Sequence, residues 1–133
     1  MRVLLAMALA LLILIPIGLN AQNQKVKSAE FSHFWVKFKT AIAKNDKKQV
    51  ASMTKFPFPY KVYGEKDLSR TEFITKYDEI FDRTTRLCFS RKKTIPIENN
   101  AFYYGYSVFC DSSIYSFEKL DREYKFSDKY PDD

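Results

Sequence analysis

The sequence predicts an α+β domain in which three N-terminal helices pack on a curved antiparallel sheet built by the rest of the chain. Three observations carry this prediction. Apolar residues recur with a helical period before residue 82, and the period changes towards two after residue 84. The 133 residues suffice for a single domain. All 12 Phe, 9 Tyr and 1 Trp follow residue 30, so aromatic rings supply most of the expected core.

The first 21 residues are predicted to be a signal peptide and not part of the domain. Arg2 is their only charge, an unbroken apolar run covers 3–15, and Ala21 offers the small residue that a signal peptidase requires. The run is shorter than the roughly 20 residues of a membrane span. We therefore expect a secreted or periplasmic protein that is cleaved after Ala21, begins with a loose polar lead-in over 22–27, and keeps no membrane span after cleavage.

Two helices are expected next. The first runs from Ser28 to Lys44, because its bulky residues fall on one narrow stripe when successive residues are placed 100° apart. The stripe consists of Phe31, Phe34, Trp35, Phe38 and Ile42. Asp46 and Gln49 have the spacing of a capping box and predict a short second helix that reaches about Thr54.

A link with two prolines separates these helices from the third. The segment Phe56–Tyr60 is predicted to be extended, because the residue before a proline avoids the helical region. Ser69 and Glu72 form a second capping box, and the helix that they begin is expected to end near Asp82. Its apolar face consists of Phe73, Ile74, Tyr77, Ile80 and Phe81.

Alternating residues predict four strands in the last part of the chain. They cover 86–90, 102–110, 113–120 and 123–126, and Asp121-Arg122 is expected to form a two-residue hairpin between the last two. Gly105 inside the second strand indicates a bend, a bulge or the close approach of another group. The domain is thus expected to span 28–126, followed by a frayed charged tail over 127–133.

The two cysteines can be interpreted in two ways. An even number of cysteines in an exported protein favours a disulfide between Cys88 and Cys110. Strand parity argues against it, because Cys110 alternates in phase with Tyr106, whereas Cys88 alternates out of phase with Leu87 and Phe89. If these apolar residues face one core, the two sulfur atoms point to opposite faces. Both arrangements stay open at this point.

Charge and composition exclude several functions. The formal net charge is +6, but Lys and Arg are scattered among Asp and Glu, as on an ordinary solvated surface. Weak attraction to anionic envelope polymers or lipid head groups is the alternative. Nucleic-acid binding is not expected, because no basic stripe with interleaved aromatics is present. Two Cys and one His match no metal-ligand spacing, and no cofactor motif occurs.

The order of elements resembles the nuclear transport factor 2-like superfamily, whose cone-shaped α+β fold is also called cystatin-like. The resemblance to secreted bacterial members rests on Phe34-Trp35 and Phe38 in the first helix, the link Thr54–Phe58, and the final hairpin Tyr115–Phe126. In that hairpin Tyr124 occupies a position where many members carry Trp. The resemblance implies a pocket between the helices and the concave sheet, and pairing of two copies through the sheet, but no single activity.

Chemistry in such a pocket would need a His–Asp or Asp–Tyr set of the kind that isomerase and dehydratase members use. His33, the single His, falls opposite the apolar stripe of the first helix and is expected on the surface. Asp78 lies on the flank of the third helix and could reach a pocket rim, and Glu118 is a weaker candidate of the same kind. Lone carboxylates are mostly solvated or paired with lysine. An enzyme that uses Asp78 is therefore the alternative function.

The leading expectation is a secreted, non-enzymatic module that binds a small apolar or amphipathic ligand or serves in assembly, as a monomer or as a homodimer through the sheet. Phase places aromatic candidates at the edge of the pocket. They are Trp35, Tyr77, Phe81, Tyr104 and Tyr106. The competing interpretation is that these rings only fill the core.

Overall fold

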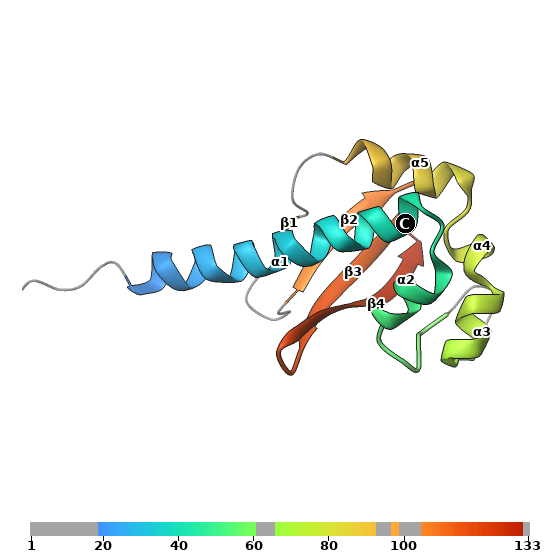
Figure 1. Cartoon of the computed structure of the whole chain (residues 1–133), viewed down its shortest axis with the longest axis horizontal. Helices are drawn as coiled ribbons and strands as arrows, with labels where there is room; N and C mark the ends of the chain where they lie inside the picture. Colours follow the sequence, from blue (N-terminus) through green and yellow to red (C-terminus); the bar gives the residue numbers. More distant parts are fainter. Residues whose placement is uncertain (1–18, 61–65, 93–96, 99–104, 132–133) are drawn as a thin grey trace, which may run out of the picture.

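The computed structural model describes residues 19–60, 66–92, 97–98 and 105–131, with side chains from residue 29 onwards except those of 97–98. Within these ranges the protein is α+β, as predicted, and five helices precede a four-stranded antiparallel sheet of order β1-β2-β3-β4 (Figure 1). The elements are α1 (Leu19–Ala43), α2 (Lys47–Ser52), α3 (Arg70–Thr75), α4 (Tyr77–Ile80), α5 (Arg83–Arg91), β1 (Ile97–Glu98), β2 (Gly105–Cys110), β3 (Ser113–Leu120) and β4 (Glu123–Pro131).

Helix α1 crosses the inner face of the sheet, and its N-terminal half extends beyond the rest of the molecule (Figure 1). It begins at Leu19, so it passes through residues 22–27, where the sequence predicts a loose lead-in. Four members of the predicted stripe are buried, namely Phe31, Trp35, Phe38 and Ile42, and Phe34 is partly buried at its edge.

The predicted strand at 86–90 is wrong, because these residues belong to α5. Asp82 caps this helix by accepting a hydrogen bond from the backbone N–H of Thr85 at 2.8 Å. Thr85 and Phe89 lie four residues apart on one helical face, and both are buried. The alternation of Leu87 and Phe89 covers too few residues to distinguish a strand from a short amphipathic helix.

The predicted third helix is divided in two. Helix α3 ends at Thr75, its C-cap Lys76 has a non-helical ψ of 8°, and α4 follows directly. Together with α5, this division gives five helices within the described residues, where three were predicted. Both predicted N-terminal caps are confirmed: Ser69 and Glu72 form a full capping box, and the Asp46 side chain accepts from the N–H of Gln49.

The sheet is a meander, and its last hairpin is the predicted one. Leu120 pairs with Glu123 around a two-residue turn in which Asp121 has φ of 54°. Strand β4 continues to Pro131, so the prediction of a frayed tail from residue 127 is wrong: backbone pairing with β3 holds this segment in the sheet. Gly105 marks a close approach, since a Cβ there would meet the carbonyl oxygen of Phe117.

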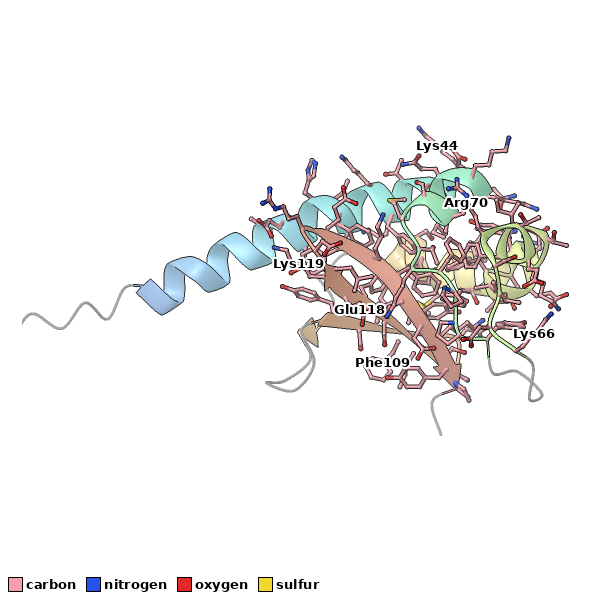
Figure 2. All side chains as sticks on the ribbon, turned by 90° about the horizontal axis from the view of Figure 1, so that it is seen from below. Lys44, Lys66, Arg70, Phe109, Glu118 and Lys119 are labelled. Atoms are coloured by element: carbon pink, nitrogen blue, oxygen red, sulfur yellow. A yellow bond between two sulfur atoms is a disulfide. The ribbon has the colours of Figure 1, made fainter. Side chains whose placement is uncertain are left out.

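Aromatic rings fill the space between the helices and the inner face of the sheet. Phe38 contacts Phe117 and Phe126 of the sheet, with centroid separations of 5.1 and 5.6 Å. The largest fully buried side chains are Tyr77, Tyr115, Phe31, Phe38, Phe58, Phe73, Phe81, Phe89, Phe117, Phe126, Ile42 and Ile80. The outer face carries Phe109 and Glu118, which point away from α1 in Figure 2.

Candidate functional site

The predicted pocket residues that the structure describes lie inside this aromatic core. Trp35, Tyr77, Phe81 and Tyr106 are between 0% and 4% exposed, and Tyr104 lies outside the described residues. Tyr77 contacts Phe81 with ring centroids 5.2 Å apart, and Tyr106 stacks on a ring of α1. Their role in ligand binding stays a prediction, but the open surface of the molecule lies elsewhere.

A groove of about 680 Å³ lies at the surface between α1, the C-terminal end of α2 and the β3–β4 hairpin. We call it the hairpin groove. Its volume falls within the range of small-molecule sites, roughly 300–1,000 Å³. It is lined by Ala29, Glu30, His33, Phe34, Lys37, Gln49, Ser52, Met53, Arg122, Glu123, Tyr124 and Lys125.

The floor of the hairpin groove is apolar. Phe34 reaches it from the edge of the α1 stripe, and its ring centroid lies 6.1 Å from that of Tyr124 at the start of β4. Met53 is the C-cap of α2, and its carbonyl accepts a hydrogen bond from the N–H of Phe126 at 2.8 Å. This bond holds the end of α2 against β4, so the floor combines side chains from three elements that are distant in sequence.

The rim of the hairpin groove is charged, and its carboxylates already have cationic partners. Glu30 forms an ion pair with Lys119, and Glu123 forms one with Lys125 at 3.3 Å. The hydrogen bond from Lys119 to Glu30 raises the pKa of that lysine. Two further cations line the groove, Lys37 on α1 and Arg122 in the hairpin turn, and neither forms an ion pair with a described residue.

The hairpin groove was not predicted from the sequence. Lys37, Met53, Arg122 and Tyr124 belong to segments that only the folded chain brings together. The one available sign was Phe34, which sits at the edge of the helical stripe and not at its centre, as expected of a ring that is half covered.

The candidate catalytic residues occupy separate places. His33 is exposed on the groove rim, as the helical phase predicts. Asp78 is 64% exposed and pairs with Lys47 at 2.9 Å and with Arg86 at 3.9 Å. Glu118 bonds Lys55 on the outer face of the sheet. These three side chains are not brought together into one site. The described residues hold no cluster of His, Cys, Asp or Glu that could bind a metal ion.

Two buried tyrosines differ in how their hydroxyl groups are satisfied. Tyr115 donates to the hydroxyl oxygen of Thr85 at 3.3 Å, and burial raises its pKa. The hydroxyl of Tyr77 is buried without a hydrogen-bond partner among the described residues. Burial raises the pKa of Tyr77 to about 12, although the charge of Arg86 opposes this rise. The Tyr77 hydroxyl is thus a buried polar group without a hydrogen bond to the described residues, although the Lys47 ammonium lies 5.6 Å from the centroid of its ring.

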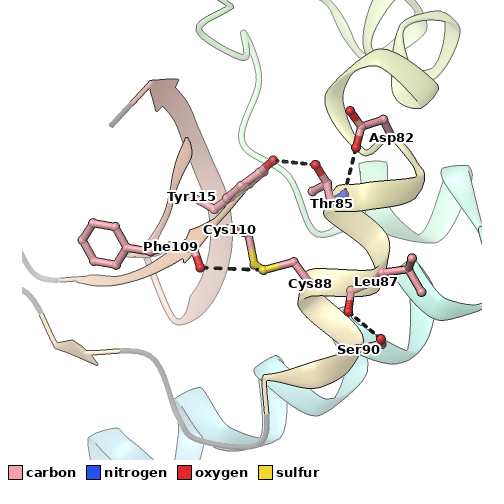
Figure 3. Close-up of a disulfide and its surroundings, with 8 residues drawn as sticks. All are labelled: Asp82, Thr85, Leu87, Cys88, Ser90, Phe109, Cys110 and Tyr115. Atoms are coloured by element: carbon pink, nitrogen blue, oxygen red, sulfur yellow. Dashed lines mark hydrogen bonds between the residues drawn. A yellow bond between two sulfur atoms is a disulfide. The ribbon is translucent and has the colours of Figure 1, made fainter. Parts of the chain in front are cut away.

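The disulfide between Cys88 and Cys110 is confirmed, and it joins α5 to β2 with a Cα–Cα distance of 5.7 Å (Figure 3). The parity argument against it fails because Cys88 belongs to a helix, where strand alternation does not apply. Figure 3 also shows that the ring of Phe109, next to Cys110, points away from α5.

An apolar row crosses the outer face of the sheet. Phe109, Ile114 and Tyr130 are direct cross-strand partners on β2, β3 and β4. Phe109 is 47% exposed and Tyr130 is 40% exposed. A smaller hollow of about 440 Å³ is lined by Lys66, Leu68, Glu72 and Lys76, so three of its four lining residues are charged.

The part of the chain with described coordinates contains no helix whose length and apolar character would allow it to cross a membrane. Comparisons of the chain with protein-family models, curated proteins and solved structures gave no match.

Proposed function

We propose that this protein is a secreted, non-enzymatic binding module that holds a small amphipathic molecule in the hairpin groove. One observation carries the proposal: the groove combines an apolar floor with a charged rim, while aromatic rings fill the interior of the fold. Such a site can bury an apolar tail and leave a polar head at the water boundary. The cone-shaped superfamily suggested by the order of elements hosts binding modules of this kind.

The enzyme alternative has less support. Asp78, its candidate acid–base residue, is exposed and held in ion pairs with Lys47 and Arg86. A general acid or base is usually placed in a concave site where its pKa is shifted towards neutrality. Asp78 does not line the hairpin groove, so it could not act on a molecule bound there.

Two observations support the secreted location: the predicted signal peptide over 1–21 and the disulfide. The test is the intact mass of protein recovered from the exported fraction of an expression host. Cleavage after Ala21 gives a chain that begins at Gln22. Exported protein that still contains Arg2 would contradict the proposal.

Binding is tested by nuclear magnetic resonance with methyl-labelled methionine. Met53 is the single methionine after residue 7, so its methyl signal reports on the groove floor. We expect decanol, added to exported protein, to shift this signal in a saturable way. Gln49→Trp fills the groove from an exposed position and should abolish the shift, whereas Lys48→Trp, at the neighbouring exposed position outside the lining, should preserve it. A Met53 signal that no amphiphile moves would refute the function.

A second candidate function is assembly of two copies through the outer face of the sheet. The row of Phe109, Ile114 and Tyr130 favours it, because an apolar row with a ring at each end can pack on a second copy of itself about a two-fold axis. Sedimentation analysis of the protein and of Phe109→Lys tests it. A dimer that Phe109→Lys dissociates supports assembly, and a monomer at all accessible concentrations excludes it.

A further inference from the structure

We propose that the hairpin groove selects amphiphiles with an anionic head group, of which a medium-chain carboxylate is the simplest member. This inference rests on the proposed function and adds the chemistry of the head group. It is carried by the two cations of the rim, Lys37 and Arg122, which form no ion pair with the described residues.

The balance of charge at the rim is positive. The acidic side chains that line the groove, Glu30 and Glu123, are each compensated by a lysine, Lys119 and Lys125 respectively. Lys125 also donates to the carbonyl of Ser52 at 2.9 Å, which holds its ammonium group at the end of α2. With these pairs neutralised, the surplus charge comes from Lys37 and Arg122, and the local potential attracts anions.

The two surplus cations come from different elements of the groove lining. Lys37 extends from α1, one helical turn after His33, and Arg122 extends from the turn between β3 and β4. A head group at the rim therefore experiences the positive charge of cations from two elements. A guanidinium group can form two parallel hydrogen bonds with a carboxylate, and an ammonium group adds a compact point charge.

The floor determines where the rest of such a molecule lies. Phe34, Met53 and Tyr124 offer an aromatic and thioether surface suited to an alkyl chain. The attraction for a head group comes from the two cations that form no ion pair, and one negative charge on the head is enough to engage it. A monoanion with an apolar tail fits both features.

The experiment compares three probes with the same ten-carbon tail, each below its micellar concentration: decanoate, decanol and decyltrimethylammonium. The Met53 methyl signal of exported protein reports binding of each. We expect decanoate to bind about tenfold more tightly than decyltrimethylammonium, with decanol between them, and we expect added salt to reduce this preference.

Two variants locate the effect. Lys37→Gln and Arg122→Gln should each weaken decanoate binding about threefold more than they weaken decanol binding. Lys44→Gln is the matched control. Lys44 is an exposed lysine directly after the end of α1 (Figure 2), and it does not line the groove. It should change neither affinity.

The outcomes separate the two proposals. If decanol and decanoate bind with equal affinity, the preference for an anionic head is wrong and the binding function stands. If Lys44→Gln weakens decanoate binding as much as Lys37→Gln and Arg122→Gln do, the attraction is a property of the whole basic surface and the groove does not select the head group. If none of the probes moves the Met53 signal, the binding function itself fails.

Discussion

Phe31 of α1 and Tyr106 of β2 stack almost parallel, with ring centroids 3.7 Å apart and ring planes 11° from one another. This contact closes the space between helix and sheet at the place where the sequence predicts a pocket edge. Phe31 also meets Tyr124 at 5.1 Å, edge to face. The same ring that fills the interior therefore supports the floor of the hairpin groove from below, and the stability of the core and the shape of the groove are coupled.

The first prediction concerns this central ring. Phe31→Ala removes a fully buried aromatic side chain and should lower the free energy of unfolding by about 3–5 kcal/mol, a large fraction of the stability of a small domain. Urea unfolding measures the loss. Val36→Ala, on the same helix but 60% exposed, is the control and should change stability by less than about 0.5 kcal/mol. Equal losses for the two variants would show that the α1 stripe does not carry the core.

The second prediction concerns the disulfide. It closes a loop with a sequence separation of 22 residues. In the chain-entropy model such a loop contributes about 3 kcal/mol, so replacing both Cys88 and Cys110 by Ser should lower the melting temperature measurably. A reducing agent should lower the melting temperature of the original protein and leave that of the double variant unchanged. If reduction has no effect on the original protein, the bridge is absent from the protein in solution.

Local signals predicted much of this fold. The helical phase of Phe31, Trp35 and Phe38 gave the correct buried face of α1, because large rings along one side of a helix are removed from water only when that side packs against the core. The box formed by Ser69 and Glu72 gave the correct start of α3, because it satisfies backbone donors without help from distant residues.

The predictions that failed concerned features that depend on tertiary packing or segments too short to show a clear period. Residues 86–90 have a pattern that fits either element type, and the Asp82 cap that decides for a helix is a weaker signal than the alternation that it opposes. The hairpin groove could not be predicted, since Met53 and Tyr124 meet only through the pairing of Met53 with Phe126. Sequence phase identified which side chains are buried, but not whether their rings leave space between them.

The third prediction concerns the cap of α5. The backbone N–H of Thr85 donates to the carboxylate of Asp82 and lowers the pKa of this residue. Because its pKa is lowered, the carboxylate contributes its full stability when the pH lies above the ordinary pKa of an aspartate. This contribution is lost as the pH falls through the lowered pKa of the folded state. Asp82→Ala should cost about 1 kcal/mol at neutral pH and less in acid.

The matched variant for this cap is Asp82→Asn, which keeps an acceptor for the N–H of Thr85 but carries no charge. It should retain most of the stability, and the part that it retains should not change between neutral and acidic pH. Urea unfolding at a series of pH values measures both variants. A constant difference between the original protein and Asp82→Ala across this series would contradict the role of the charged cap.

The last prediction uses two fully buried tyrosines as a matched pair. Tyr115→Phe removes a donor to Thr85, a hydroxyl that is itself buried, and should lower the free energy of unfolding by about 1 kcal/mol. Tyr77→Phe removes a buried hydroxyl that has no partner among the described residues, and should therefore raise the free energy of unfolding by a similar amount.

The pKa of Tyr77 is raised to about 12 by burial. A phenol with a raised pKa in the folded state costs stability as the pH climbs past its ordinary value, because only the unfolded chain ionises. The advantage of Tyr77→Phe should consequently grow above pH ~10. Denaturant unfolding at neutral and alkaline pH measures both variants, and a loss of stability in Tyr77→Phe equal to that in Tyr115→Phe would show that the Tyr77 hydroxyl has a partner after all.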